Sequence, residues 1–319
     1  MAGGGNKAVV AALLANTGIA ITKFAAWGLT QSATMLAEAI HSLADAGNQV
    51  LLLVGAKRAK READELHQFG FGRERYVYSF IVAIVLFSVG GLFALYEGYH
   101  KVHEPHAIEH WKWVPIAVLL AAIVMESLSF RTAILEANKL RGSVSWTRFV
   151  RNARAPELPV ILLEDFAALT GLVLALIGVV LTLATGNGIF DGLGSMAIGA
   201  LLVAVAIFLA IEMKSLLLGE SATREVQSKI VAAIESVPGV ERLIHIKTLH
   251  LGPEEILVAA KVAVAPGADA AAIAETIDAA ERAIRATEPM AQQIYLEPDI
   301  YTDTYTPDER PAVPEAPSH

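Results

Sequence analysis

The chain has 319 residues, of which 54% are hydrophobic and 18% charged, and its mean hydropathy is +0.49. This composition excludes an ordinary soluble globular protein and indicates an integral membrane protein. The formal net charge is −8 and cysteine is absent, which excludes disulfides, thiolate metal sites and cysteine redox chemistry. Any transition metal must therefore be held by His, Asp or Glu.

Six stretches of about 20 or more apolar residues predict six transmembrane helices. They cover roughly residues 8–29, 32–56, 77–100, 112–137, 159–185 and 191–214. Basic residues gather in the connections 57–75 and 139–154, and the positive-inside rule makes such loops cytoplasmic. We therefore expect a six-helix transmembrane domain over residues 1–215 in the cell inner (plasma) membrane, with both termini in the cytoplasm.

The second span contains three ionisable side chains, Glu38, His41 and Asp45, although such groups are expensive inside a membrane. At about 100° per residue they share one helix face. His41 and Asp45 are four residues apart, so their Cβ atoms are expected about 5–6 Å from each other. Imidazole and carboxylate together suit a divalent metal, zinc above all. The alternative is that the two side chains bond each other and a neighbouring helix and only orient the bundle.

The fifth span places two acids, Glu164 and Asp165, next to each other. Adjacent residues point about 100° apart on a helix, so both cannot aim at one ion. One is expected to be a ligand, and the other a supporting base, a proton carrier or a group that reaches water. Alternatively, both acids lie near the membrane surface, because the span begins only at Pro159.

Other polar residues of the spans have structural explanations. Lys23 and Glu97 lie near span ends, where long side chains extend toward the membrane surface. Glu126 and Arg131 are five residues apart, about 140° around the helix, so a direct pair is not expected. Asp191 is expected to cap the sixth helix.

A soluble domain is expected over residues 219–301. An amphipathic helix (228–236) precedes two strands (240–251 and 255–264), a helix (269–287) and a last strand (292–297). The order α-β-β-α-β predicts a small ferredoxin-like α+β fold with too few site residues for an independent enzyme. The tail, residues 302–319, has four prolines among acidic residues and is expected to be disordered.

Four features together resemble the cation diffusion facilitator family. They are the run Ala-Glu-Ala-Ile-His-Ser-Leu-Ala-Asp at 37–45 with Asn48 after it, Phe-Gly-Phe-Gly-Arg at 69–73, Asp-Gly-Leu-Gly-Ser at 191–195, and the C-terminal domain. The resemblance implies a six-helix divalent-metal/proton antiporter with a cytosolic ferredoxin-like domain, usually homodimeric. The Glu-Asp-Phe-Ala-Ala run at 164–168 resembles a branch that includes the mitochondrial zinc-transporter-like members.

The resemblance also implies a transport site. In this family, a His/Asp-x-x-x-Asp pair in the second helix meets a His-x-x-x-Asp pair in the fifth. The first pair matches His41 and Asp45. Asp165 matches the second aspartate, but Ile161 stands where the histidine is expected, and Glu164 is a candidate to compensate. The expected transport site therefore comprises His41, Asp45, Asn48, Glu164 and Asp165.

The loop before the third span usually offers an interfacial metal site in this family. Asp64 and His67 fit that site, and Phe71 stands where a third ligand, histidine, would be. The resemblance therefore implies at most a weak metal site in this loop.

The C-terminal domain keeps two candidate metal ligands, His245 and His250, in its first strand. Lys261 and Tyr295 stand near positions where the family often has histidines. A regulatory metal pair is thus in doubt, and the domain is expected to serve mainly in dimerisation.

The sequence therefore predicts a divalent-cation efflux transporter, a zinc/proton antiporter that works by alternating access. Metal ligands must lose their protons to bind an ion, and His41 is the natural proton carrier. The expected partners are divalent metal ions, protons, the lipid bilayer and a second copy of the chain, without nucleic acid or a resident cofactor. The alternatives are a cobalt, iron or manganese exporter, a membrane-embedded metallohydrolase with Glu164 as base, and a metal sensor or scaffold that transports nothing.

Overall fold

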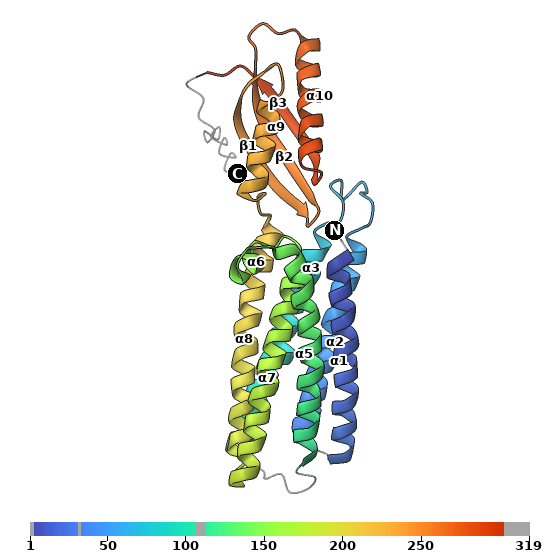
Figure 1. Ribbon diagram of the computed structural model, residues 1–319, viewed down its shortest axis with the longest axis vertical. Coiled ribbons are helices and arrows are strands. Elements are labelled where there is room, and N and C mark those ends of the chain that lie inside the picture. Colours follow the sequence, from blue (N-terminus) through green and yellow to red (C-terminus); the bar gives the residue numbers. More distant parts are fainter. Residues whose placement is uncertain (1–2, 31–32, 106–112, 303–319) are drawn as a thin grey trace, which may run out of the picture. The chain divides into compact units, whose positions relative to one another are not determined.

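The computed structural model describes the backbone of residues 3–30, 33–105 and 113–302 (Figure 1). The chain divides into two compact units, Met1–Leu218 and Gly219–His319. Apart from residue 302, the tail that is expected to be disordered lies outside the described residues.

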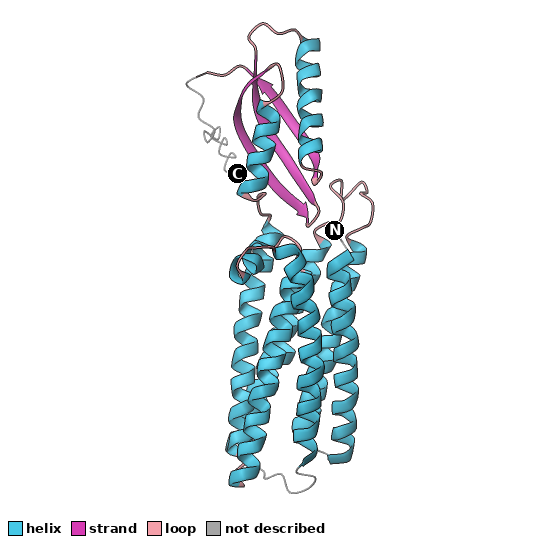
Figure 2. Cartoon of the chain, viewed as in Figure 1, coloured by secondary structure: helices cyan, strands magenta, loops and turns pink. Residues whose placement is uncertain are grey.

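Long helices that run up and down build the first unit (Figure 2). They are α1 (Gly3–Thr30), α2 (Ala33–Arg58), a continuous third helix made of α3 (Glu74–Val85), η1 (Leu86–Leu92) and α4 (Phe93–His103), α5 (Trp113–Arg141), α7 (Glu157–Thr185) and α8 (Ile189–Leu218). Within the described residues, five of them are long and apolar enough to cross a membrane. The other, α2, has 26 residues, and its apolar character is interrupted by the polar residues of the candidate site. The six predicted spans therefore all correspond to helices.

The six long helices pack as a closed ring. Contacts link α1 to α2, α2 to α3, α4 to α8, α8 to α7, α7 to α5 and α5 back to α1. The buried cluster of this unit draws side chains from all around the ring, such as Leu52, Val82, Leu119, Ile161 and Leu202. The ring therefore encloses the polar residues of α2 and α7 within apolar walls.

Two local features were not predicted from the sequence. The third helix contains a seven-residue π-helical segment, η1, with Gly90 and Gly91 near its end. Such segments are rare and often lie at functional sites. A short helix, α6 (Trp146–Asn152), is capped by Ser145, whose side chain accepts a bond from the backbone N–H of Arg148.

Glycines allow α4 and α8 to approach closely. A Cβ atom on Gly199 would lie 2.7 Å from the backbone nitrogen of Leu95 and 2.9 Å from the carbonyl oxygen of Gly91. A Cβ atom on Gly98 would lie 2.7 Å from the backbone nitrogen of Met196. Small residues at a crossing let helix backbones pack tightly in a membrane, where the hydrophobic effect does not drive helices together.

Ion pairs connect helices near both ends of the ring. Arg75 donates two hydrogen bonds to the buried Glu157, one of them from Nη2 to Oε2 at 2.8 Å. At the opposite end Lys101 pairs with Asp191 at 3.0 Å. The side chain of Asn187 accepts a bond from Ile189 N–H at the start of α8. Asn187 therefore does the capping that was expected of Asp191, which instead joins α8 to α4.

The second unit is a three-stranded sheet with two helices. Its elements are α9 (Arg224–Glu235), β1 (Val240–Gly252), β2 (Glu255–Val264), α10 (Ala270–Thr287) and β3 (Ala291–Asp299). The strands lie in the order β1-β2-β3, with β1 antiparallel to β2, and β3 parallel to β2. Ile230 and Ile284 of the helices pack with Ile256 and Val258 of β2 in one core. The predicted α-β-β-α-β order is confirmed.

Candidate metal-binding site

The pair on α2 is formed as the four-residue spacing predicts. His41 Nε2 lies 3.5 Å from Asp45 Oδ2. Asp45 is only 4% exposed, and Nδ1 of His41 is buried without a hydrogen-bond partner. The side chain of Glu38 lies outside the described residues. The two facing atoms of His41 and Asp45 therefore present one nitrogen and one oxygen toward a shared position.

The adjacent acids of α7 point toward different helices. Glu164 accepts hydrogen bonds from Asn48 Nδ2 at 2.9 Å and from Gln49 Nε2 at 3.1 Å. Asp165 accepts a bond from Ser129 Oγ of α5 at 3.1 Å, and its other oxygen, Oδ1, is buried without a hydrogen-bond partner. Both acids are almost fully buried. Neither acid is therefore exposed to water in this structure, whereas their depth relative to the membrane surface stays a prediction.

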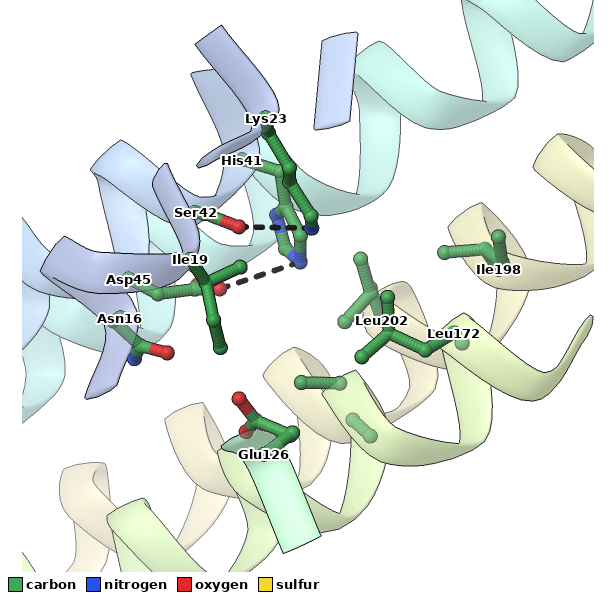
Figure 3. Close-up of a pocket in the computed structure, with 13 residues that line it drawn as sticks. Asn16, Ile19, Lys23, His41, Ser42, Asp45, Glu126, Leu172, Ile198 and Leu202 are labelled. Atoms are coloured by element: carbon green, nitrogen blue, oxygen red, sulfur yellow. Dashed lines mark hydrogen bonds and ion pairs between the residues drawn. The ribbon is translucent and has the colours of Figure 1, made fainter. Parts of the chain in front are cut away.

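A small cavity of about 20 Å³ lies beside the His41–Asp45 pair. This volume suits about one water molecule or one ion that has shed its hydration shell. Figure 3 shows His41, Asp45 and Lys23 on one side of the cavity and Glu126 on the opposite side. Its lining residues are Asn16, Ile19, Lys23, His41, Ser42, Asp45, Glu126, Ala167, Ala168, Gly171, Leu172, Ile198 and Leu202.

Sequence reasoning missed two residues of this cavity. Lys23 is 2% exposed and donates a hydrogen bond to Ser42 Oγ at 2.9 Å. The expectation that Lys23 extends to the membrane surface is therefore wrong. Glu126 is also 2% exposed and interacts electrostatically with Asp45 and Asp165. The signal that identified the α2 pair, an ionisable side chain inside an apolar span, was present for Glu126 as well.

The structure brings the expected ligands into one region but does not close them around one point. Electrostatic interactions connect Asp45 with Glu126, Glu164 and Asp165. Yet among the residues that the structure describes, no group of three or more His, Asp or Glu side chains is arranged to hold a metal ion. The fifth expected residue, Asn48, bonds Glu164 rather than facing the α2 pair.

The candidate loop site has two of its three positions filled by suitable side chains. His67 Nδ1 lies 3.0 Å from Asp64 Oδ1, and the same oxygen accepts the backbone N–H of His67 at 2.7 Å. These contacts hold the pKa of Asp64 below its usual value. Phe71 packs against the His67 ring, with centroids 4.5 Å apart. The two side chains of this exposed loop therefore contact each other through Asp64 Oδ1 and His67 Nδ1, and an aromatic ring occupies the third position.

The two histidines of β1 do not lie together. His245 pairs across the sheet with Lys261, and His250 pairs with Ile256, in an uninterrupted register between the two positions. Because they are five positions apart, an odd number, their side chains point to opposite faces. His250 is buried on the face of Ile256, whereas Lys261 beside His245 forms ion pairs with Glu297 and Asp299, each at 3.0 Å. A shared metal site for His245 and His250 is therefore excluded within this strand.

The sequence of this chain is similar to those of several named proteins. The Xenopus laevis and Homo sapiens proteins called "Proton-coupled zinc antiporter SLC30A9, mitochondrial" are each 34% identical over 261 residues, which is 81% of this chain and 46% of theirs. Metal tolerance protein C4 of Arabidopsis thaliana is 30% identical over 77% of this chain and 54% of its own. The chain thus spans about half the length of these curated relatives. A solved variant of MamM-CTD aligns with 25% of this chain and 100% of its own, at 25% identity and a TM-score of 0.24.

These relatives correct the expected location. The names of four of them place those proteins in mitochondria. The expected location in the cell inner (plasma) membrane, with cytoplasmic termini, is contradicted and is wrong. It rested on the positive-inside rule, which orients loops across a membrane but does not identify the membrane. The expectation of a multi-pass membrane protein still holds, because the described chain contains several helices that are long and apolar enough to cross a membrane.

The helical unit also matches a family model. The model described as the cation efflux transmembrane domain covers residues 9–218. That range takes in all six helices of the ring, the His41–Asp45 pair and both acids of α7. The resemblance to the cation diffusion facilitators, including the branch with mitochondrial zinc transporters, is thereby confirmed. The chain belongs to the cation efflux family.

Proposed function

We propose that this chain moves a divalent cation across a membrane in exchange for protons, with zinc as its first substrate. The observation that carries the proposal is the His41–Asp45 pair beside a small cavity inside a ring of apolar helices. The names of the relatives, proton-coupled zinc antiporters at 34% identity over most of this chain, support it.

Charge balance explains why a cation and protons would be exchanged. Four carboxyl groups, those of Asp45, Glu126, Glu164 and Asp165, are buried near one another. Several negative charges cannot remain unneutralised in a buried site. A divalent cation can neutralise them, and so can protons, and ligands must lose protons before they bind metal. Loading the site on one side therefore releases protons, and unloading on the other side takes protons up.

Hydrogen bonding suggests how the roles are divided. His41 Nε2 and Asp45 Oδ2 are 3.5 Å apart and face a shared position. Asp165 keeps one oxygen without a hydrogen bond, so it is the acid of α7 that we assign as the next ligand. Glu164 is held by both Asn48 and Gln49. We therefore assign Glu164 to anchoring α7 against α2. Asn48 donates to Glu164 through Nδ2, and its Oδ1 is buried without a hydrogen-bond partner, so that oxygen can assist in binding the ion.

A second cavity supports access to the site from the other end of the ring. It has a volume of about 30 Å³, and His41 lines both cavities. Glu97 and Lys101 of α4 and Ser195 of α8 line the second cavity, and these residues lie toward the end of the ring opposite Arg75. His41, Ile198 and Leu202 line both small cavities, so the two cavities adjoin at the His41 side chain.

The donor atoms favour zinc without excluding related metals. The site offers one imidazole nitrogen and carboxylate oxygens, and the chain has no cysteine. Imidazole suits zinc, whereas a set of oxygens alone would favour magnesium, calcium or manganese. Cobalt, manganese and iron(II) are the alternative substrates to compare.

Flux into proteoliposomes tests the proposal. Purified full-length protein is reconstituted, a pH gradient is imposed, and uptake of zinc, cobalt, manganese and iron(II) is followed. We expect gradient-dependent zinc uptake that Asp45→Ala and Asp165→Ala each reduce to the level of protein-free vesicles, because each variant removes a ligand. Asp278→Ala, an exposed carboxylate on α10, serves as the matched control and is expected to transport like wild type.

Other outcomes would identify the rival functions. No flux combined with tight metal binding that depends on Asp45 would point to a sensor or to a metal-dependent hydrolase. Wild-type flux in either variant would remove that residue from the mechanism. Flux of cobalt or manganese in preference to zinc would support the proposed transport of divalent cations and contradict zinc as the first substrate.

The assembly is a separate proposal. The resemblance to the cation diffusion facilitators implies a homodimer, with the C-terminal domain contributing to its contacts. We propose this dimer for the full chain. Light scattering coupled to size-exclusion chromatography in detergent, corrected for the bound detergent, tests it: a protein mass of one chain would contradict it.

A further inference from the structure

A lysine side chain shares the cavity of the expected metal ligands. Lys23 of α1 is 2% exposed, and it lines the same cavity as His41, Asp45 and Glu126 (Figure 3). Its Nζ donates a hydrogen bond to Ser42 Oγ at 2.9 Å. A primary ammonium is therefore held inside the space that a transported cation would occupy.

Lys23 differs from two partly buried cations of the ring, Arg75 and Lys101, in what surrounds it. Arg75 is bound to Glu157 and Lys101 to Asp191, at the two ends of the ring. Lys23 instead stands among the acids of the cavity, where it interacts electrostatically with Glu126. A buried charge needs compensation by opposite charge, and the acids of the cavity supply it.

The same charge opposes metal binding. A divalent ion that enters the cavity meets the attraction of Asp45 and Glu126 and the repulsion of Lys23. Charges a few ångströms apart interact strongly where water is excluded. A carrier must also let its ion go, and a cationic group inside the site weakens binding in a way that favours release.

We propose that Lys23 is a tethered cation, which neutralises Asp45 and Glu126 while no metal is bound and lowers the affinity of the site for the transported ion. This inference rests on the proposed function, since it assigns the cavity to a divalent cation. It makes Lys23 a positioning and affinity-setting residue rather than a ligand.

Equilibrium binding of zinc to the purified full-length protein tests the assignment. Lys23→Met removes the charge and keeps the length of the side chain, and Lys23→Gln removes the charge but retains a donor for Ser42. We expect the Kd for zinc to fall at least tenfold in both variants. The matched control is Lys139→Met at the end of α5, where the lysine is exposed and pairs with Glu136; its Kd should equal that of wild type.

A double-mutant comparison assigns the effect to the cavity. In the Asp45→Ala background, Lys23→Met should change the Kd by less than twofold, because the site that the lysine opposes has been dismantled. An unchanged or weaker zinc affinity in folded Lys23→Met and Lys23→Gln, judged by elution volume and circular dichroism, would overturn the proposal. If one variant does not fold, the other decides.

Transport measurements separate this inference from the proposed function. Tighter binding should slow release, so Lys23→Met should show a lower maximal zinc flux than wild type. If wild type carries no zinc but the Kd for zinc still falls in the lysine variants, the role proposed for Lys23 is supported and the proposed antiport is contradicted. If wild type carries zinc and the lysine variants bind it no more tightly than wild type, the proposed antiport is supported and the role proposed for Lys23 is contradicted.

Discussion

Replacing Gly199 by alanine tests how closely α4 and α8 must pack. The added Cβ would lie 2.7 Å from the backbone nitrogen of Leu95 and 2.9 Å from the carbonyl oxygen of Gly91. Favourable contacts between heavy atoms lie at about 3.5–4.0 Å. A third obstructing atom is Cγ of the Leu95 side chain at 2.7 Å. Because the other two atoms belong to the backbone, turning that side chain does not relieve the contact, and the two helices must separate by about 0.8 Å or more.

The expected cost follows from two opposing effects. Forcing an extra methyl group into a packed contact costs about 1–3 kcal/mol. Alanine in a helix interior regains about 0.5–1 kcal/mol over glycine. We therefore expect Gly199→Ala to lower the free energy of unfolding by about 1–2 kcal/mol, which corresponds to a melting temperature lower by about 2–8 °C for a unit of this size.

Gly47→Ala provides the control, because a Cβ atom on Gly47 of α2 would meet nothing within 4 Å. This variant has only the gain in helix propensity and should melt at or slightly above the wild-type temperature. The four tryptophans allow melting to be followed by intrinsic fluorescence in detergent, which suits a chain without cysteines for thiol dyes. Equal melting temperatures for the two variants would refute the argument that the glycines set the α4–α8 distance.

Two further predictions concern ion pairs. Arg75→Met leaves the buried carboxylate of Glu157 without its partner and should lower the stability of the helical unit by about 3–5 kcal/mol. The control Lys139→Met removes an exposed charge and should lower the stability by at most about 1 kcal/mol. Similar melting temperatures for the two variants would contradict this prediction. In the C-terminal domain, hydrogen bonding from Lys261 holds the pKa of Asp299 below its ordinary value of 3.8. The ion pair therefore stabilises the fold fully above pH 3.8, and this contribution is lost as the pH falls through the lowered pKa. Asp299→Asn should accelerate hydrogen exchange in β3 at pH 7. The difference from wild type, corrected for intrinsic rates, should shrink as the pH falls through the lowered pKa of Asp299; a constant difference would contradict the linkage.

The sequence predicted those parts of the site that depend on a single helix. The His41–Asp45 pair follows from a four-residue spacing, and the six spans follow from apolar length. The roles of Glu164 and Asp165 could not be predicted, because they depend on donors supplied by α2 and α5. Lys23 was misplaced for the same reason: its distance from a span end suggested water, but neighbouring helices bury it in the cavity.

Other differences come from local geometry that composition does not encode. The π segment of the third helix changes which side chains face inward. It could not be predicted from a regular 3.6-residue apolar pattern. In β1, His245 and His250 looked like one pair in the sequence. They are five positions apart in the strand, an odd number, and the register is free of bulges between them, which places their side chains on opposite faces.

The two bonded acids of α7 limit how this helix can move. Glu164 is held from α2 and Asp165 from α5, in directions about 100° apart around the helix axis. Turning α7 about its own axis would break at least one of these bonds and leave a buried carboxylate with fewer donors, at a cost of about 1–3 kcal/mol. Tilting α7 together with α2 and α5 keeps these three bonds. In the proposed transport cycle, rotation of this single helix therefore costs buried hydrogen bonds, whereas a movement that α7 shares with α2 and α5 preserves them.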